Sequence, residues 1–123
     1  MANKISFDYD STLSESWVQS LASLLIPVTE VWIVTSRSPG KSHNRDLYKT
    51  SAELGIPEER IVFTDGAYKW SSLKHHGIEV HFDDMEDEIL EINNQTECKG
   101  VLVGLKDAGE LWYLFNNQKE KEN

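Results

Sequence analysis

The sequence of 123 residues contains a single cysteine, only three prolines and no long apolar run. The lone Cys98 cannot form an internal disulfide, and it excludes a zinc cage built from cysteines. No apolar stretch approaches the ~20 residues that a membrane-spanning helix needs. No signal peptide follows the N-terminal Met-Ala-Asn-Lys. We therefore expect a cytoplasmic protein with no membrane partner.

Cations are also scarce, because 12 Lys and Arg residues stand against 21 Asp and Glu residues, for a net charge of −9. A uniformly acidic surface disfavours general binding of nucleic acid, although it leaves room for a local basic patch. The length is enough for one domain and too short for two. We expect a single domain over residues 1–115 and a polar tail over residues 116–123. The sequence does not indicate the oligomeric state.

Apolar runs alternate with stretches of helical periodicity, which predicts strands alternating with helices. The predicted strands lie at residues 4–8, 31–34, 61–63, 78–82 and 101–103. The predicted helices lie at residues 17–25, 44–54, 68–76 and 85–92. In the first helix, helical spacing predicts an apolar stripe formed by Trp17, Leu21, Leu24 and Leu25. Gly55 and Gly77 stand just after the second and third helices, where left-handed caps are common.

This alternation predicts an α/β fold, a three-layer Rossmann-like sandwich in which helices cover both faces of a mostly parallel sheet. The segment at residues 111–115 is open to two interpretations. It is either a sixth strand that follows a hairpin turn at residues 106–109 or a terminal helix, and we slightly favour the strand.

Polar residues follow three of the predicted strands at the point where each strand ends. They are Asp8 and Asp10, Thr35 and Ser36, and Asp83 and Asp84. Ligands of such sheets bind outside the carboxyl ends of the strands. Nearby carboxylates repel each other unless a hard cation such as Mg²⁺ offsets their charge. An Asp-x-Asp pair can also simply cap a turn, but three polar clusters at one sheet edge favour a site.

In these residues the chain resembles the haloacid dehalogenase (HAD) superfamily of phosphatases, in a minimal form without a cap. Four motifs occur in the family's order: Asp8-x-Asp10-x-Thr12, then Thr35, then Lys69, then the pair Asp83 and Asp84. Position 11 is Ser where many relatives carry Gly, which we expect to be tolerated. The resemblance implies a HAD-like core. Because residues 13–30 and 38–63 leave no room for a cap domain, we expect an open active site.

The resemblance implies a Mg²⁺-dependent phosphomonoester hydrolase that acts through an aspartyl-phosphate intermediate. Asp8 resembles the nucleophile, and Asp10 resembles the general acid and base. The metal ligands would be the Asp8 carboxylate, the Asp10 carbonyl and Asp83, with Asp84 bound more loosely. Asp84 could instead cap the fourth helix.

The resemblance also implies a phosphate-binding set of Thr35, Ser36 and Lys69, in which Lys69 offsets the negative charge around Asp8. The assigned roles of Thr35 and Lys69 each have an alternative. Thr35 could be only a helix or turn cap, and Lys69 could be a solvated helix residue. Lys74 competes for the same role, but it lies nearer the end of the helix.

The other polar residues give weaker indications of a functional role. We expect the histidines at positions 75, 76 and 81 to lie on the surface, and we expect Asp87 to lie on a solvated helix face. The cations Arg37, Lys41, Arg45 and Lys49 are either ordinary solvated charges or a patch that touches an anionic part of the substrate. An open site would suit a phosphorylated macromolecule better than a small sugar phosphate.

Two other functions remain open. A non-catalytic phosphate-binding or protein-interaction domain could retain the fold, although Asp10 argues against it. A phosphotransfer receiver domain also uses an acidic pair, a Thr and a Lys. In a receiver the acidic pair follows the first strand and the phosphorylated Asp follows a later one, so the order of motifs here favours the phosphatase.

Overall fold

The computed structural model describes residues 3–103. These residues form a five-stranded sheet of order β3-β2-β1-β4-β5, in which every neighbouring pair is parallel. The strands are β1 (Asn3–Phe7), β2 (Thr29–Thr35), β3 (Ile61–Phe63), β4 (Val80–Asp83) and β5 (Lys99–Leu102). The predicted α/β class is therefore confirmed. The predicted hairpin, the segment at 111–115 and the tail lie outside the described residues.

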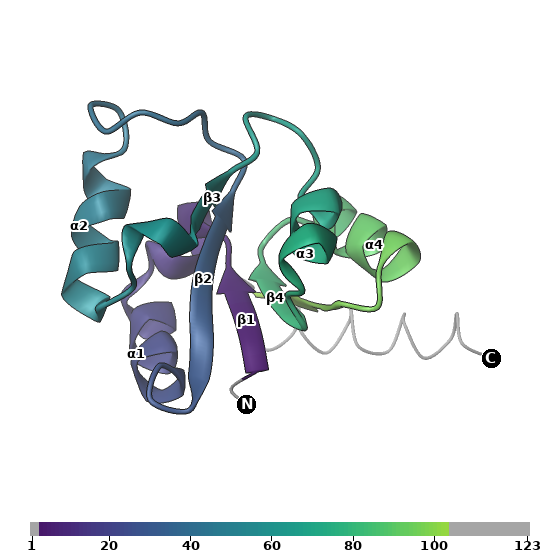
Figure 1. Cartoon of the computed structure of the whole chain (residues 1–123), viewed down its shortest axis with the longest axis horizontal. Coiled ribbons are helices and arrows are strands. Elements are labelled where there is room, and N and C mark those ends of the chain that lie inside the picture. The colour runs from purple at the N-terminus through teal and green to yellow at the C-terminus, as the bar shows by residue number, and fades with distance from the viewer. Residues whose placement is uncertain (1–2, 104–123) are drawn as a thin grey trace, which may run out of the picture.

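Helices cover both faces of the sheet, as Figure 1 shows: α1 and α2 on one side, α3 and α4 on the other. Their bounds are α1 (Ser16–Leu25), α2 (Arg45–Leu54), α3 (Trp70–His76) and α4 (Glu86–Gln95). Two short helical turns, η1 (Tyr9–Leu13) and η2 (Glu58–Arg60), complete the described chain. As expected, the connections around β2 hold only single helices and short turns, so no cap domain is inserted there. None of these described helices is long and apolar enough to cross a bilayer.

Alternation along the central strands divides the core into two layers. In β1 and β2, Phe7 and Ile33 are buried toward α1 and α2, where Leu47 of α2 meets them. The next residue of β2, Val34, faces the other way and packs with Leu73 of α3. Both faces are therefore apolar along most of their length. A polar side chain on either face of the central strands is consequently buried.

The predicted apolar stripe of the first helix is half right, because Leu21 and Leu25 pack against the core but Trp17 and Leu24 do not. Trp17 is 54% exposed and Leu24 is 76% exposed, whereas Val18 and Ala22 are the buried residues of α1. The two stripes differ by one residue, which is ~100° around a helix. Because apolar residues occur on both stripes, periodicity alone could not decide which one faces the sheet.

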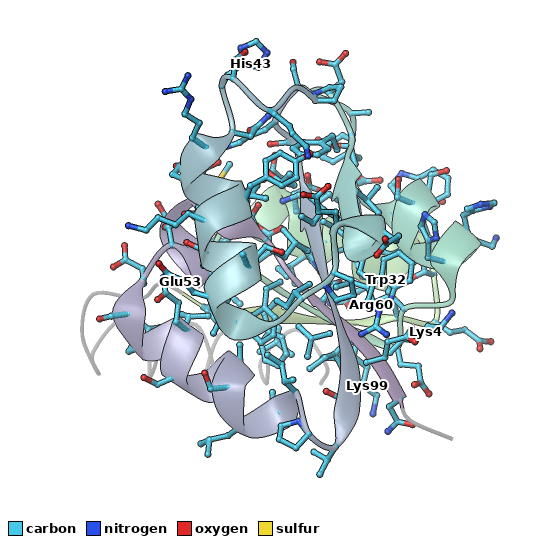
Figure 2. The ribbon with its side chains drawn as sticks, turned by 60° about the vertical axis from the view of Figure 1, so that its left-hand side comes forward. Lys4, Trp32, His43, Glu53, Arg60 and Lys99 are labelled. Atoms are coloured by element: carbon cyan, nitrogen blue, oxygen red, sulfur yellow. The ribbon has the colours of Figure 1, made fainter. Side chains whose placement is uncertain are left out.

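A cluster around Trp32 ties β1, β2 and η2 together. Glu30 accepts a hydrogen bond from Trp32 Nε1 at 2.9 Å and lies 3.6 Å from Arg60 and 4.0 Å from Lys4. Figure 2 shows Lys4, Trp32 and Arg60 gathered together, well away from His43 in the loop before α2. The charges of this cluster are paired with each other, so the group supports the fold and offers no site.

Candidate functional site

The carboxyl ends of β1 and β4 bring three carboxylates together. Asp8 follows β1 directly, and its N–H donates to the Phe82 carbonyl of β4 at 2.8 Å. Asp83 is the last residue of β4, and Asp84 follows it. Ligand atoms of Asp8, Asp83 and Asp84 all lie within 4.8 Å of one another, so the three carboxylates could hold a metal ion. Carboxylate oxygens are the ligands that hard cations prefer, and a cation would relieve their mutual repulsion.

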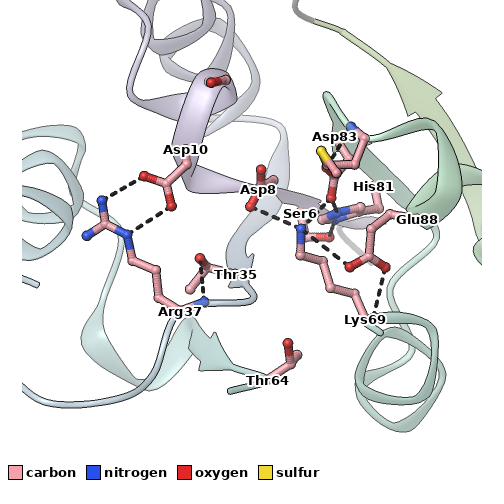
Figure 3. A network of polar contacts seen from close by, with 12 residues as sticks. Ser6, Asp8, Asp10, Thr35, Arg37, Thr64, Lys69, His81, Asp83 and Glu88 are labelled. Carbon is pink, nitrogen blue, oxygen red and sulfur yellow. Dashed lines mark hydrogen bonds and ion pairs between the residues drawn. The ribbon is translucent and has the colours of Figure 1, made fainter. Parts of the chain in front are cut away.

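Lys69 places its ammonium between the carboxylates (Figure 3). Its Nζ lies 3.0 Å from Asp8 Oδ1, 2.5 Å from Asp83 Oδ2 and 3.9 Å from Glu88 Oε2. Lys69 stands directly before α3 and is only 2% exposed, which excludes the alternative of a solvated helix residue. Lys74 is exposed and lines a different cavity. The structure therefore brings Lys69, and not Lys74, to the carboxylates.

Burial and charge oppose each other in this cluster. Burial raises the pKa of Asp8 to about 7, and the Asp83 carboxylate adds to the rise while Lys69 opposes it. Burial alone would lower the pKa of Lys69, but Asp8 and Asp83 outweigh it and raise that pKa. Burial alone would raise the pKa of Asp83, but the hydrogen bond from His81 and the Lys69 charge lower it. Lys69 and Asp83 are thus an ion pair, while Asp8 needs a further positive charge to be fully ionised at neutral pH.

His81 was expected on the surface, and that prediction is wrong. It lies in β4 with no exposed area, its Nε2 is 2.8 Å from Asp83 Oδ2, and its Nδ1 is 2.7 Å from Ser6 Oγ of β1. Burial lowers the pKa of His81, so the ring is neutral at neutral pH. A carboxylate only accepts hydrogen bonds. Hence Nε2–H donates to Asp83, and Nδ1 accepts from the Ser6 hydroxyl.

The burial of His81 could have been inferred from the sequence. In a strand, His81 and Asp83 share one face while Val80 and Phe82 share the other. We expected the polar face to meet solvent, but a parallel sheet is covered on both faces. His81 therefore had to be buried next to the acidic pair.

Glu88 of α4 is a second site residue that the sequence analysis missed. It is buried, and its Oε1 accepts a hydrogen bond from the Lys69 backbone N–H at 3.0 Å. Burial raises the pKa of Glu88. Its position four residues before the buried Ile92 places both on the same face of α4, which was the available signal. Glu88 holds the start of α3, and with it Lys69, against the cluster.

The Asp10 carboxylate lies apart from the acidic cluster of Asp8, Asp83 and Asp84. The first strand, β1, ends at Phe7. Asp10 therefore belongs to the turn η1, and its side chain is exposed. Its carboxylate accepts hydrogen bonds from Arg37 Nε at 2.9 Å and Nη2 at 2.7 Å. The group of carboxylates that could hold a metal ion therefore contains Asp8 but not the carboxylate of Asp10. The metal role suggested by the resemblance uses the Asp10 carbonyl instead.

Arg37 also holds a second carboxylate. Its Nη1 and Nη2 donate to Asp46 at 2.8 and 2.9 Å, and its guanidinium lies 4.9 Å from the centre of the Tyr9 ring. The hydrogen bond from Arg37 lowers the pKa of Asp46 to about 2. Arg37 is thus neutralised by Asp10 and Asp46, and it fixes the direction of the Asp10 side chain.

The remaining motif residues lie around the same edge. Thr35 is buried, and its Oγ1 accepts a hydrogen bond from the Arg37 N–H at 3.3 Å, as in a turn cap. Ser36 is exposed and lines the cavity in front of Asp8.

Thr12 Oγ1 is buried without a hydrogen-bond partner among the described residues. Ser11 has φ +58°, in the left-handed region where Gly is most comfortable, yet the turn accommodates it. Asp84 does not cap α4, whose N-cap is Met85.

The site opens into a cavity of about 500 Å³. Its lining residues are Asp8, Asp10, Ser11, Ser36, Gly66, Tyr68, Lys69, Asp84, Met85, Asp87 and Glu88. Asp87 is exposed, as expected. The basic stretch lies elsewhere, because Lys41, Arg45 and Lys49 line a separate cavity beside α2. There Lys41 pairs with Glu58 at 3.3 Å, and Lys49 lies 3.9 Å from Glu53.

No protein-family model matches the chain, and a search of curated proteins found none similar to it. The fold and the acidic cluster therefore have to be interpreted from their own chemistry. The arrangement combines a buried carboxylate whose pKa is raised, a fixed ammonium and three carboxylates that could hold a metal ion.

Proposed function

We propose that this chain is a Mg²⁺-dependent phosphomonoester hydrolase of the HAD type with Asp8 as its nucleophile. The observation that carries the proposal is the cluster of Asp8, Asp83 and Asp84 around the Lys69 ammonium at the carboxyl edge of a parallel sheet. The order of the sequence motifs supports the same function.

Asp8, Asp83 and Asp84 would hold the cation, which neutralises the carboxylates and the incoming phosphate and orients the phosphate for attack. Lys69 adds a positive charge that does not depend on the metal. Attack requires the ionised form of Asp8, whose pKa is raised to about 7. The positive charges of the cation and of Lys69 would both favour that ionised form. His81 and Ser6 keep the Asp83 carboxylate in place.

In the first step an Asp8 carboxylate oxygen attacks phosphorus, and the bond from phosphorus to the ester oxygen breaks. Asp10, released from Arg37 and protonated, would give its proton to the departing oxygen. In the second step a water molecule attacks the phosphorus of the aspartyl-phosphate, and Asp10 takes the water's proton. The bond to Asp8 then breaks, inorganic phosphate leaves, and both carboxyl groups return to their starting forms. Asp10 would leave Arg37 for both steps and could pair with it again between cycles.

One observation favours a second candidate, a phosphate-binding domain without turnover. The Asp10 carboxylate accepts two hydrogen bonds from Arg37, so in this conformation it is engaged away from a leaving group. The two candidates differ in whether Asp10 exchanges that partner during a cycle.

Sustained hydrolysis of p-nitrophenyl phosphate with Mg²⁺ tests the proposal. We expect turnover that stops in EDTA and in Asp8→Asn. The matched control is Glu86→Gln, which removes an exposed carboxylate from the first turn of α4, outside the cavity lining. Binding of phosphate without turnover would support the second candidate, and full turnover in EDTA would overturn the metal role.

A further inference from the structure

Two exposed apolar side chains line the cavity in front of Asp8. Tyr68, in the loop between β3 and α3, is 49% exposed, and Met85, in the loop between β4 and α4, is 50% exposed. Other exposed apolar residues of the described chain, such as Leu24 and Leu90, do not line this cavity. An aromatic ring and a thioether are the side chains that pack best against another flat ring.

The charges of the cavity wall are almost all negative. Asp10, Asp84, Asp87 and Glu88 line it, and Lys69 is the single cation among its described lining residues. The Lys69 ammonium already contacts Asp8 and Asp83. Arg37, next to the cavity, is neutralised by two carboxylates. Within the described residues, the wall therefore leaves no unpaired cation for a second anionic group on a substrate.

Resting on the proposed function, we propose that the cavity takes a phosphomonoester whose leaving group carries a planar aromatic ring and no further negative charge. The phosphate would face Asp8, and the ring would pack against Tyr68 and Met85. A nucleoside monophosphate has this chemistry. A simple sugar phosphate lacks the ring, and a nucleic-acid end carries further phosphates that the acidic wall repels. This proposal departs from the sequence-based expectation of a phosphorylated macromolecule, because a nucleoside monophosphate is a small substrate.

Two substrates with the same leaving oxygen test the ring. They are adenosine 5′-monophosphate and the 5-phosphate of methyl riboside, which has the same sugar but no base. We expect wild-type kcat/KM to be about tenfold higher for the nucleotide, as the usual strength of base–aromatic stacking implies. In Tyr68→Ala and in Met85→Ala the preference for the nucleotide over the base-free substrate should fall severalfold.

Leu90→Ala is the matched control, because Leu90 is an exposed apolar residue of α4 outside the cavity lining. It should leave the preference unchanged. Tyr68 and Met85 are both about half exposed, so their variants should fold, which circular dichroism checks. A preference that survives in both alanine variants, or that is absent in the wild type, overturns the proposal.

A third substrate, adenosine 3′,5′-bisphosphate, tests the charge. The acidic wall should make its kcat/KM clearly lower than that of the monophosphate, and an equal or higher value overturns the proposal in favour of nucleic-acid ends. If no substrate is hydrolysed, the proposed function fails. Calorimetry on the wild-type protein then still decides the inference, because adenosine monophosphate should bind more tightly than the base-free phosphate. Hydrolysis without any preference for the base overturns the inference alone.

Discussion

At the scale of single residues, Asp8 carries a charge that the fold accommodates poorly without a cation. Its pKa rises from 3.8 to about 7 because the side chain is buried and faces Asp83. The folded state therefore binds the proton more tightly than the unfolded state. The stability that this proton contributes is fully present below about pH 4 and is lost as the pH rises through about 7.

We accordingly predict that Asp8→Asn stabilises the metal-free protein at alkaline pH. The amide removes a buried charge, and Lys69 keeps Asp83 and Glu88 as partners. In EDTA at about pH 8, the free energy of unfolding should rise by about 1 kcal/mol or more, and the gain should shrink toward about pH 4. Urea denaturation at several pH values measures this. A variant less stable than wild type at the higher pH would contradict the assigned pKa.

His81 allows a second residue-scale prediction, because its two ring nitrogens have separate partners. A glutamine amide nitrogen can occupy the place of Nε2 and keep the hydrogen bond to Asp83. An asparagine amide lies nearer the place of Nδ1 and keeps only Ser6. We predict that His81→Asn weakens Mg²⁺ binding by about tenfold or more, and that His81→Gln weakens it less. Calorimetric titration with Mg²⁺ measures both, and equal losses would mean that His81 acts only through packing.

At the scale of elements, periodicity predicted the strands and helices of the described chain to within a few residues. Gly55 and Gly77 do take the left-handed conformation after α2 and α3, with φ of +81° and +68°. What periodicity could not give was the side from which each element is covered. Half of the predicted stripe of α1 and the predicted exposure of His81 were wrong for that reason, because burial depends on partners distant in the sequence.

The candidate site was predictable where it depends on strand ends and not where it depends on side-chain pairing. Asp8 and Asp83 meet because β1 and β4 are neighbours in a parallel sheet. The hydrogen bonds that Arg37 donates to Asp10 join residues 27 positions apart. The contact between Lys69 and Glu88 depends on how α3 packs on α4. Neither leaves a local pattern in the sequence.

Lys69, directly before α3, and Lys74, within it, allow a third prediction. Lys69→Ala leaves Asp8 and Asp83 buried together without their cation, so we expect a loss of about 3 kcal/mol of stability in EDTA. Part of that loss should return with Mg²⁺, which offsets the same charges. Lys74 is exposed, and Lys74→Ala should change stability by less than about 0.5 kcal/mol. If Lys74→Ala lowered stability and phosphatase activity as much as Lys69→Ala does, the assignment of Lys69 as the site lysine would be wrong.

At the scale of the whole molecule, the acidic cluster sits where the two halves of the fold meet. Asp8 leads from β1 into η1 and α1 on one face of the sheet, and Asp83 and Asp84 lead from β4 into α4 on the other. A cation held by all three would therefore connect segments that separate on unfolding. The chain as a whole has a net charge of −9, and a bound divalent ion would offset part of it.

Binding of an ion to the folded state alone raises the free energy of unfolding, by about 2.7 kcal/mol when the ion is at about 100 times its Kd. For a domain of this size, 1 kcal/mol corresponds to several degrees in Tm. We therefore predict that saturating Mg²⁺ raises the Tm of the wild-type protein by about 10 °C over its value in EDTA. Asp83→Asn should abolish the rise, because it removes one of the three carboxylates of the cluster, whereas Glu86→Gln should retain it. Scanning calorimetry in both conditions measures the difference, and an equal rise in wild type and Asp83→Asn would place the ion outside this cluster.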